Sequence, residues 1–316
     1  MRHLLTVVAI LAALIVAAAC GGGTSTDSDE TRWPKVLELT DREITPLPLN
    51  SQLAVGDERF LLGLLDSKGE LILEAQLTLR FFKLEGESGT LKAEAPATFI
   101  SLEENFVHEH EDGELHTHAF RDLGAYAARF QFDEAGDWGV EVTGLREAEE
   151  IELVRLRFTV LEEGTVPSIG EPAPRSEQLT LRDVADISEI DTANPPHPEM
   201  HELTVAQALD SGKPVVIAFA TPAFCTSRIC GPVLDAVVVP LFDQYSDQVE
   251  FIHIEPYFLE DARAGRGLIP VDALLEWGLQ SEPWVFVIDR EGRIAGKFEG
   301  IASVEEVETV LQEVLG

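Results

Sequence analysis

Hydrophobic and polar residues alternate along the first half of the chain with the period of two that a half-buried β-strand requires. The alternation is clearest at residues 151–160. Apolar stretches at 59–65, 71–82, 125–132 and 138–143 predict four more strands. Many short strands separated by turns are typical of an antiparallel β-sandwich, which we expect to span residues 36–162.

The pattern changes in the last third of the chain, where apolar strands alternate with amphipathic helices. We expect strands at 214–220, 249–255, 284–289 and 294–299, and helices at 204–211, 233–245, 272–279 and 303–315. Mixed elements around one sheet predict an α/β domain at 201–316. Residues 163–200 carry six prolines in a polar, acidic stretch and predict an extended linker.

The N-terminus has the pattern of an export signal. A positive start is followed by an apolar run at 4–19, shorter than the ~20 residues that span a bilayer. Ala17-Ala-Ala-Cys20 resembles a bacterial lipobox, although Ala17 stands where Leu is most common. That resemblance implies a signal peptide at 1–20, a lipidated Cys20 and a polar tether at 21–35. Ordinary signal cleavage is the alternative.

Charge and compartment restrict the function further. A net charge of −34 disfavours nucleic-acid binding. We expect a location on the outer face of the cell membrane, held there by the lipid anchor. Disulfides persist outside the cytoplasm, and with Cys20 lipidated the chain keeps only Cys225 and Cys230 as a free pair.

Cys225 and Cys230 lie between a predicted buried strand and a predicted helix. A helix N-terminus favours a thiolate, and Arg228 between the two cysteines adds positive charge. If Pro232 is the first helical residue, Cys230 is closest to the helix dipole and is favoured as the attacking thiol. The alternative is a static disulfide that only staples the turn.

Several features of residues 200–316 resemble the thioredoxin superfamily. They are the order of the elements, the cysteine turn, Pro240 inside the following helix, Glu282-Pro283 before a strand, and the hairpin from Asp289 to Arg293. The resemblance implies a thioredoxin-like fold, thiol–disulfide oxidoreductase or redox-relay activity, and protein thiols as partners. It also implies a cis Pro283 facing the cysteines.

This chain also departs from the pattern of that family. Its cysteines have C-x4-C spacing instead of C-x2-C, and Glu282 stands where Thr or an aliphatic residue is usual. By the family's usual order Cys225 would attack. In the N-terminal part, residues 132–142 resemble the last hairpin of bacterial immunoglobulin-like domains, so the expected sandwich is immunoglobulin-like.

Four of the eight histidines lie within a short acidic segment: His108, His110, His116 and His118. If His110 pairs with His116 and His108 with His118, all four imidazoles share one face of a hairpin. A two-residue Asp-Gly loop would shift the register by one and split them. Clustered imidazoles suit Cu or Zn, so we expect a metal site; a solvated polar hairpin is the alternative.

Two further functions remain open. Sco-type copper chaperones bind copper through two cysteines and a histidine, and Cys225 and Cys230 with His197, His201 or His253 would imitate that set. His253 alternates into a strand and is otherwise interpreted as a core residue. The last alternative is a non-enzymatic binding lipoprotein with a structural disulfide.

Overall fold

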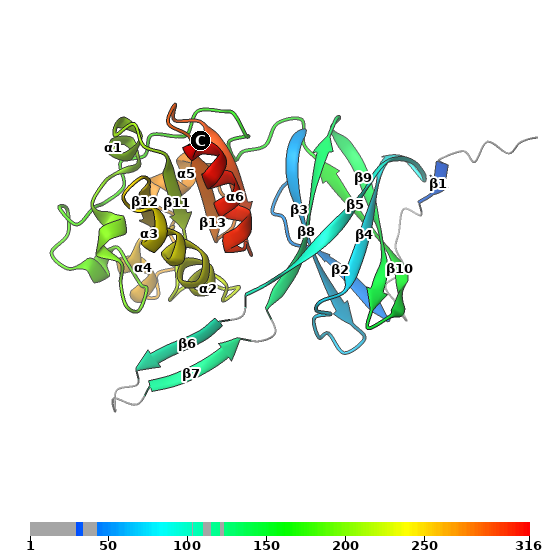
Figure 1. Cartoon of the computed structure of the whole chain (residues 1–316), viewed down its shortest axis with the longest axis horizontal. Helices are drawn as coiled ribbons and strands as arrows, with labels where there is room; N and C mark the ends of the chain where they lie inside the picture. Colours follow the sequence, from blue (N-terminus) through cyan, green and yellow to red (C-terminus); the bar gives the residue numbers. More distant parts are fainter. Residues whose placement is uncertain (1–29, 34–42, 103, 110–114, 121–122) are drawn as a thin grey trace, which may run out of the picture.

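The computed structural model describes residues 30–33, 43–102, 104–109, 115–120 and 123–316, without the side chains of residue 30 and of 104–109 and 115–120. A β-rich part and a mixed part lie beside each other (Figure 1). The N-terminal sheet contains β1 (Glu30–Arg32), β2 (Ile44–Pro48), β3 (Gly56–Asp66), β4 (Gln76–Glu85), β5 (Ser88–Ser101), β8 (Gly124–Phe132), β9 (Gly136–Arg146) and β10 (Glu149–Val160).

The strands of the N-terminal sheet run in the order β10-β9-β4-β5-β8-β3-β2, with β1 on β5, and every pairing is antiparallel. The two end strands approach each other. Just beyond them, Val55 N–H donates to the Leu161 carbonyl at 2.9 Å, and Leu161 N–H donates to the Leu53 carbonyl at 2.9 Å. The sheet is therefore nearly closed around its core.

The predicted fold class is wrong. The N-terminal part is not an immunoglobulin-like sandwich, because β5 pairs with β4 up to Ala97 and with β8 from Thr98 onward. This one long strand joins what would be two stacked sheets into a continuous, barrel-like sheet. The chain as a whole is about 40% strand and 20% helix, with a small second sheet, and does not divide clearly into a sandwich and an α/β thioredoxin-like unit.

The C-terminal sheet is small and mixed, in the order β12-β11-β13-β14. β11 (Val215–Phe219) is parallel to β12 (Glu250–Ile254) and antiparallel to β13 (Trp284–Ile288), which pairs antiparallel with β14 (Ile294–Glu299). The helices are α1 (Val205–Asp210), α2 (Cys230–Val233), the π-turn η3 (Leu234–Val238), α3 (Val239–Tyr245), α4 (Leu259–Arg263), α5 (Asp272–Glu276) and α6 (Val304–Leu315).

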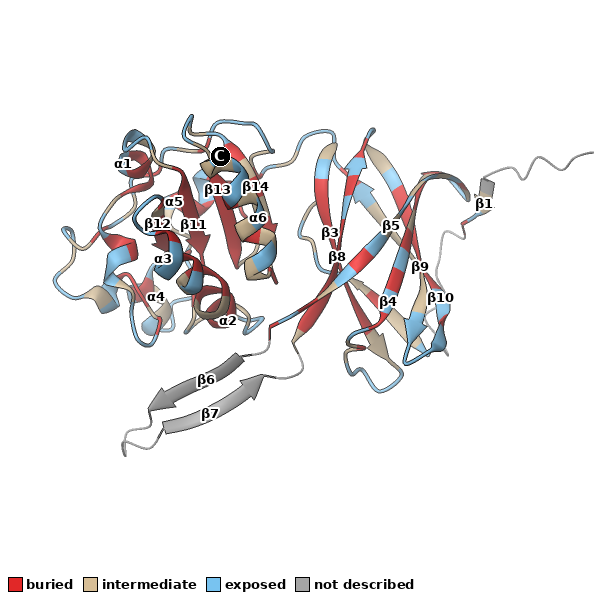
Figure 2. Cartoon of the chain, in the orientation of Figure 1, coloured by how far each residue is buried: buried red, intermediate tan, exposed pale blue. Residues whose placement is uncertain are grey.

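Both faces of the C-terminal sheet are buried, which explains its continuous apolar strands. Along β11, Val216 and Ala218 face one core, whereas Val215, Ile217 and Phe219 face the other. Figure 2 shows this buried centre. Because β11 is fully buried, it anchors the start of the loop that follows it.

The segment interpreted as a linker, 163–200, packs against the C-terminal sheet. Val166 and Ala173 are buried in its core. Thr165 Oγ1 donates to the Gly278 carbonyl at 2.7 Å, and Trp277 Nε1 donates to Ser176 Oγ at 3.2 Å. Short 3-10 turns, η1 (Ile187–Glu189) and η2 (Pro198–His201), are its helical elements. The segment thus contributes buried side chains to the C-terminal part.

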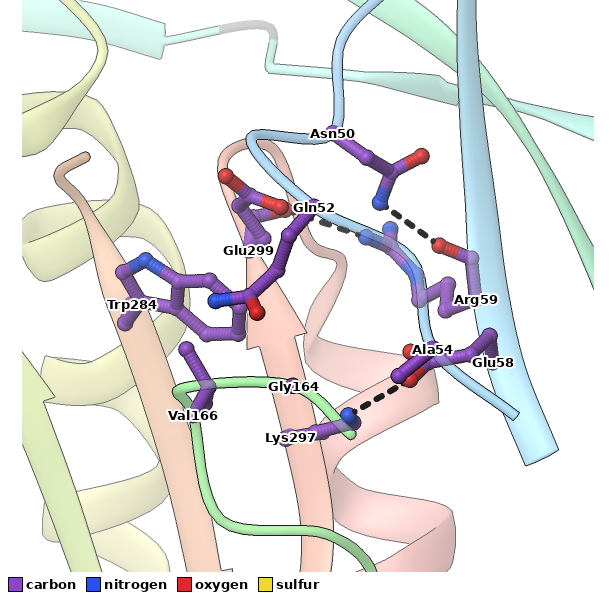
Figure 3. A pocket seen from close by; sticks show the side chains of 10 residues that line it. All are labelled: Asn50, Gln52, Ala54, Glu58, Arg59, Gly164, Val166, Trp284, Lys297 and Glu299. Carbon is purple, nitrogen blue, oxygen red and sulfur yellow. Dashed lines mark hydrogen bonds and ion pairs between the residues drawn. The ribbon is translucent and has the colours of Figure 1, made fainter. Parts of the chain in front are cut away.

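The two parts share a buried contact. Leu61 and Ala127 of the N-terminal sheet belong to the same apolar cluster as Val237 and Phe298 of the C-terminal part. Beside this cluster, Arg59 donates to both carboxylate oxygens of Glu306, at 2.8 and 2.9 Å. Figure 3 shows the neighbouring polar contacts. Among the described residues, no helix is both long and apolar enough to cross a membrane.

Candidate functional site

The two cysteines lie where the buried strand β11 leads into helix α2. Cys225 is in the connecting loop and Cys230 is the first residue of α2. A disulfide joins them, with their Cα atoms 6.0 Å apart. The predicted pairing is confirmed; its reversibility stays a prediction.

The two sulfurs differ in exposure and in contacts. Cys230 is completely buried, whereas Cys225 is half-buried. The Cys230 backbone N–H points to Cys225 Sγ at 3.3 Å, and Ser227 Oγ lies 3.1 Å from the same sulfur. Donors at these positions favour a thiolate on Cys225 when the pair is reduced.

The helix after the cysteines has an irregular centre. α2, the π-turn η3 and α3 follow one another without a break, and Pro240 lies in the first turn of α3. Proline has no N–H to continue an α-helical bond, which accounts for the altered turn before it. Arg228 is exposed in the cysteine loop with φ +63° and makes no ion pair with a described residue. Its charge therefore acts through solvent.

Glu282 and Pro283 directly precede β13, and Glu282 lies near the disulfide. The Glu282–Pro283 peptide is cis, as expected. A Glu282 carboxylate oxygen and the two sulfurs lie within 4.8 Å of one another. Tyr257 Oη donates to Glu282 at 2.7 Å, and burial together with this carboxylate raises the pKa of Tyr257. The sequence identified Glu282 only as a departure from a family pattern and gave no signal for Tyr257.

A second constellation, which we call the buried cluster, consists of Asp191, His201 and His253, and all three side chains are almost completely buried. His201 Nε2 lies 3.3 Å from Asp191 Oδ2, and His253 Nδ1 lies 3.6 Å from Asp191 Oδ1. His253 Nε2 is 3.0 Å from the Ala220 carbonyl. Sequence reasoning missed the cluster because Asp191 belongs to a segment interpreted as a solvated linker.

Charge and burial compete within the buried cluster. Burial alone would raise the pKa of Asp191, but the hydrogen bond from His201 and the nearby charge of His253 outweigh it and hold that pKa far below its usual range. Burial lowers the pKa of His201 more than Asp191 raises it. For His253 burial also acts to lower the pKa, but the Asp191 carboxylate outweighs it and the net shift is upward.

His201 and His253 line a pocket of about 310 Å³ beside β12. No described Lys or Arg lines this pocket. Its other polar walls are mainly acidic and include Glu177, Glu189, Glu255, Asp272 and Glu276. Apolar side chains such as Phe258 and Leu259 complete it. The pocket therefore favours a cation.

The histidine hairpin is only partly described. β6 (Glu104–Glu109) and β7 (Leu115–Phe120) pair with His108 opposite His116 and Phe106 opposite His118. This register differs from both of those considered from the sequence. His110 lies outside the described residues, as does Cys20. The proposed metal ligands there stay a prediction.

The Sco-like ligand set is not assembled. Among the described residues, the group that contains both sulfurs includes Glu282, whereas His201 and His253 group with Asp191. His197 belongs to neither group. No protein-family model matches this chain, and a search of curated proteins gives no match.

Proposed function

We propose that this chain is a thiol–disulfide oxidoreductase or redox relay that exchanges disulfides with protein thiols outside the cytoplasm. The observation that carries the proposal is the asymmetry of the pair: the half-buried Cys225 is bonded to a fully buried Cys230, and a backbone N–H at a helix start contacts the Cys225 sulfur. A partner thiol can reach one sulfur and not the other. The cysteine loop and Pro283 support the resemblance to the thioredoxin superfamily.

The exchange proceeds in two balanced steps. A thiolate of the partner attacks Cys225 Sγ, forms a mixed disulfide and releases Cys230 as a thiolate, which takes up a proton. A second partner thiolate attacks the mixed disulfide at the partner's own sulfur and releases the Cys225 thiolate. The partner gains a disulfide, and the chain gains two thiols. The reverse sequence reduces a partner disulfide.

Exposure and contacts favour Cys225 as the attacking thiol in this proposal. The position nearest the helix favours Cys230 when the sequence is considered alone, but the Cys230 sulfur is buried. A buried thiol is reached slowly by a macromolecular partner, whatever its pKa. Cys230 then resolves the mixed disulfide from inside the protein.

The test measures potential and reactivity together. We expect a reduction potential above about −300 mV, the value below which structural disulfides lie. We also expect Cys225 in a Cys230→Ser variant to react with iodoacetamide much faster than Cys230 in a Cys225→Ser variant. A potential well below −300 mV with both thiol pKa values at or above about 8.5 would instead identify a structural staple.

A second candidate function, metal handling, is favoured by Glu282. The two sulfurs and its carboxylate form a group of three potential ligands within 4.8 Å. Reduced thiolates suit Cu(I), so the pair would bind copper only in its reduced state. A reduction potential unchanged by Cu(I) would exclude this function.

Membrane attachment through Cys20 belongs to the same proposal. The apolar run, the small residues before Cys20 and the polar tether support it. Intact-mass analysis of the membrane-extracted protein should give a mature chain that starts at a lipidated Cys20. An unlipidated start at another residue excludes the anchor.

A further inference from the structure

We propose that Asp191, His201 and His253 bind a divalent transition-metal ion such as Zn²⁺ beside the acidic pocket. This site contains neither cysteine, and it goes beyond the proposed redox function. It also differs from the histidine hairpin, with which it shares no residue.

The contacts of each histidine with Asp191 are as short as those between two ligands of one metal ion, and each histidine approaches a different carboxylate oxygen. Ligand atoms about 2.0–2.2 Å from a tetrahedral ion lie about 3.3–3.6 Å from one another. His201 Nε2 and Asp191 Oδ2 are 3.3 Å apart, and His253 Nδ1 and Asp191 Oδ1 are 3.6 Å apart. All three potential ligand atoms lie within 4.8 Å of one another. Two imidazoles and a carboxylate are a donor set that zinc and related ions accept.

The tautomer of His253 leaves a ligand atom free. Its Nε2–H donates to the Ala220 carbonyl at 3.0 Å, so Nδ1 of the neutral ring carries a lone pair. This nitrogen is buried, has no hydrogen-bond partner and faces the Asp191 carboxylate. A lone pair facing a carboxylate is repulsive unless a cation lies between them. The alternative to a metal is a second proton on His253, which gives an ion pair.

The shell around the ligands holds them in place. The backbone N–H groups of Ala193 and His197 donate to Asp191 at 2.7 and 2.8 Å. The Ala220 carbonyl orients His253 by accepting a hydrogen bond from its Nε2–H. Backbone partners of this kind fix the orientation and tautomer of metal ligands.

The pocket provides a favourable potential. His201 and His253 form part of its wall, and Asp191 lies behind them with its side chain fully buried. Glu255 lines the same pocket, and its Oε2 is buried without a hydrogen-bond partner. The acidic walls attract a cation towards the buried cluster.

The test removes the other metal-binding groups first. The full mature chain carries alanine at His108, His110, His116 and His118 and is kept oxidised, so that the disulfide withholds both sulfurs. We expect it to bind one equivalent of Zn²⁺ by calorimetry, and Co²⁺ with visible bands of a four- or five-coordinate ion. Asp191→Asn and His201→Gln should each weaken binding by about 100-fold. The matched control is His197→Gln, which should keep the affinity.

Each outcome decides the proposal. No binding in the hairpin-free protein, or unchanged affinity in His201→Gln, overturns it. Loss of affinity in His197→Gln equal to that in His201→Gln overturns the assigned ligand set. If the Asp191 and His201 variants do not fold, X-ray absorption of the Co²⁺-loaded hairpin-free protein decides, because two imidazole ligands are expected and a spectrum without imidazole rejects the site.

Discussion

At the scale of single residues, neighbouring groups act in opposite directions on the ionisation of the reduced cysteine pair. A backbone N–H and Ser227 contact Cys225 Sγ, whereas the Glu282 carboxylate lies within 4.8 Å of both sulfurs. Hydrogen-bond donors favour a thiolate, and a nearby negative charge disfavours it. Glu282 is therefore the nearby charge whose removal tests this balance.

Glu282→Gln should lower the pKa of the Cys225 thiol by about one unit or more, because it removes a like charge within reach of the sulfur. Thiolate absorbance at 240 nm, followed against pH in a reduced Cys230→Ser background, measures the change. Arg228→Asn is the control: Asn tolerates the left-handed backbone, and the exposed charge it replaces is screened by water. A larger effect from Arg228 than from Glu282 would contradict the assignment.

At the scale of elements, the sequence predicts best the strands and helices that bury apolar side chains, because burial leaves a clear pattern of apolar residues. β11 and β13 are buried on both faces, and β14 and α6 also lie within a few residues of their predicted bounds. The sequence did not predict β5, because Ala93 to Ala97 consists of three alanines, one glutamate and Pro96, all of which have low strand propensity.

The sequence could not predict the closure of the N-terminal sheet or the buried cluster, because both depend on contacts between distant segments. β5 exchanges one neighbour for another at Thr98, and no local pattern marks that point. Asp191 meets His201 and His253 only through the path of an irregular segment. The cysteine pair could be predicted because the chain offers no other free pair.

The β6–β7 hairpin carries an independent prediction. Replacing His108, His110, His116 and His118 by alanine should remove one Cu²⁺ or Zn²⁺ site from the mature chain, because imidazoles close in sequence on paired strands can share an ion. Calorimetry of the parent and the four-alanine variant measures the difference. Glu109→Gln with Glu111→Gln is the matched control, since it changes charge in the same hairpin and keeps the imidazoles. Identical stoichiometry and affinity in parent and four-alanine protein would reject the hairpin site.

At the scale of the whole molecule, buried polar contacts join the N-terminal sheet to the C-terminal part. Arg59 is buried and contacts Glu306, the Ile301 carbonyl at 2.7 Å and the Glu299 carbonyl at 3.2 Å. Lys297 Nζ lies 2.9 Å from Glu58 Oε1 nearby, with both side chains about nine-tenths buried (Figure 3). These contacts couple the two parts.

Arg59→Ala should lower the free energy of unfolding by about 3 kcal/mol, because it leaves Glu306 and two backbone carbonyls without their partner. Urea unfolding followed by fluorescence measures this loss. Arg129→Ala is the matched control: its ion pair with Asp57 is 3.2 Å long but nearly half exposed, so it should cost at most about 1 kcal/mol. Equal losses in the two variants would show that the buried contact does not hold the parts together.

The contact between Glu58 and Lys297 makes the stability of the chain depend on pH. Burial, only partly offset by the charge and hydrogen bond of Lys297, raises the pKa of Glu58 above its usual 4.5. The folded state therefore holds this proton more tightly than the unfolded state. The contribution of Glu58 to stability is complete below about pH 4.5 and is lost as the pH rises through the raised pKa.

Glu58→Gln imitates the protonated carboxyl at every pH. Its free energy of unfolding should match that of the wild type near pH 4 and exceed it increasingly towards pH 7.5, which parallel urea titrations would measure. Lys297→Met removes the charge that lowers this pKa, so its stability should fall more steeply with pH than that of the wild type. A difference between Glu58→Gln and the wild type that stays constant from pH 4 to 7.5 would show that Glu58 keeps the same pKa in the folded and unfolded chains. The contact would then act through shape and hydrogen bonding alone.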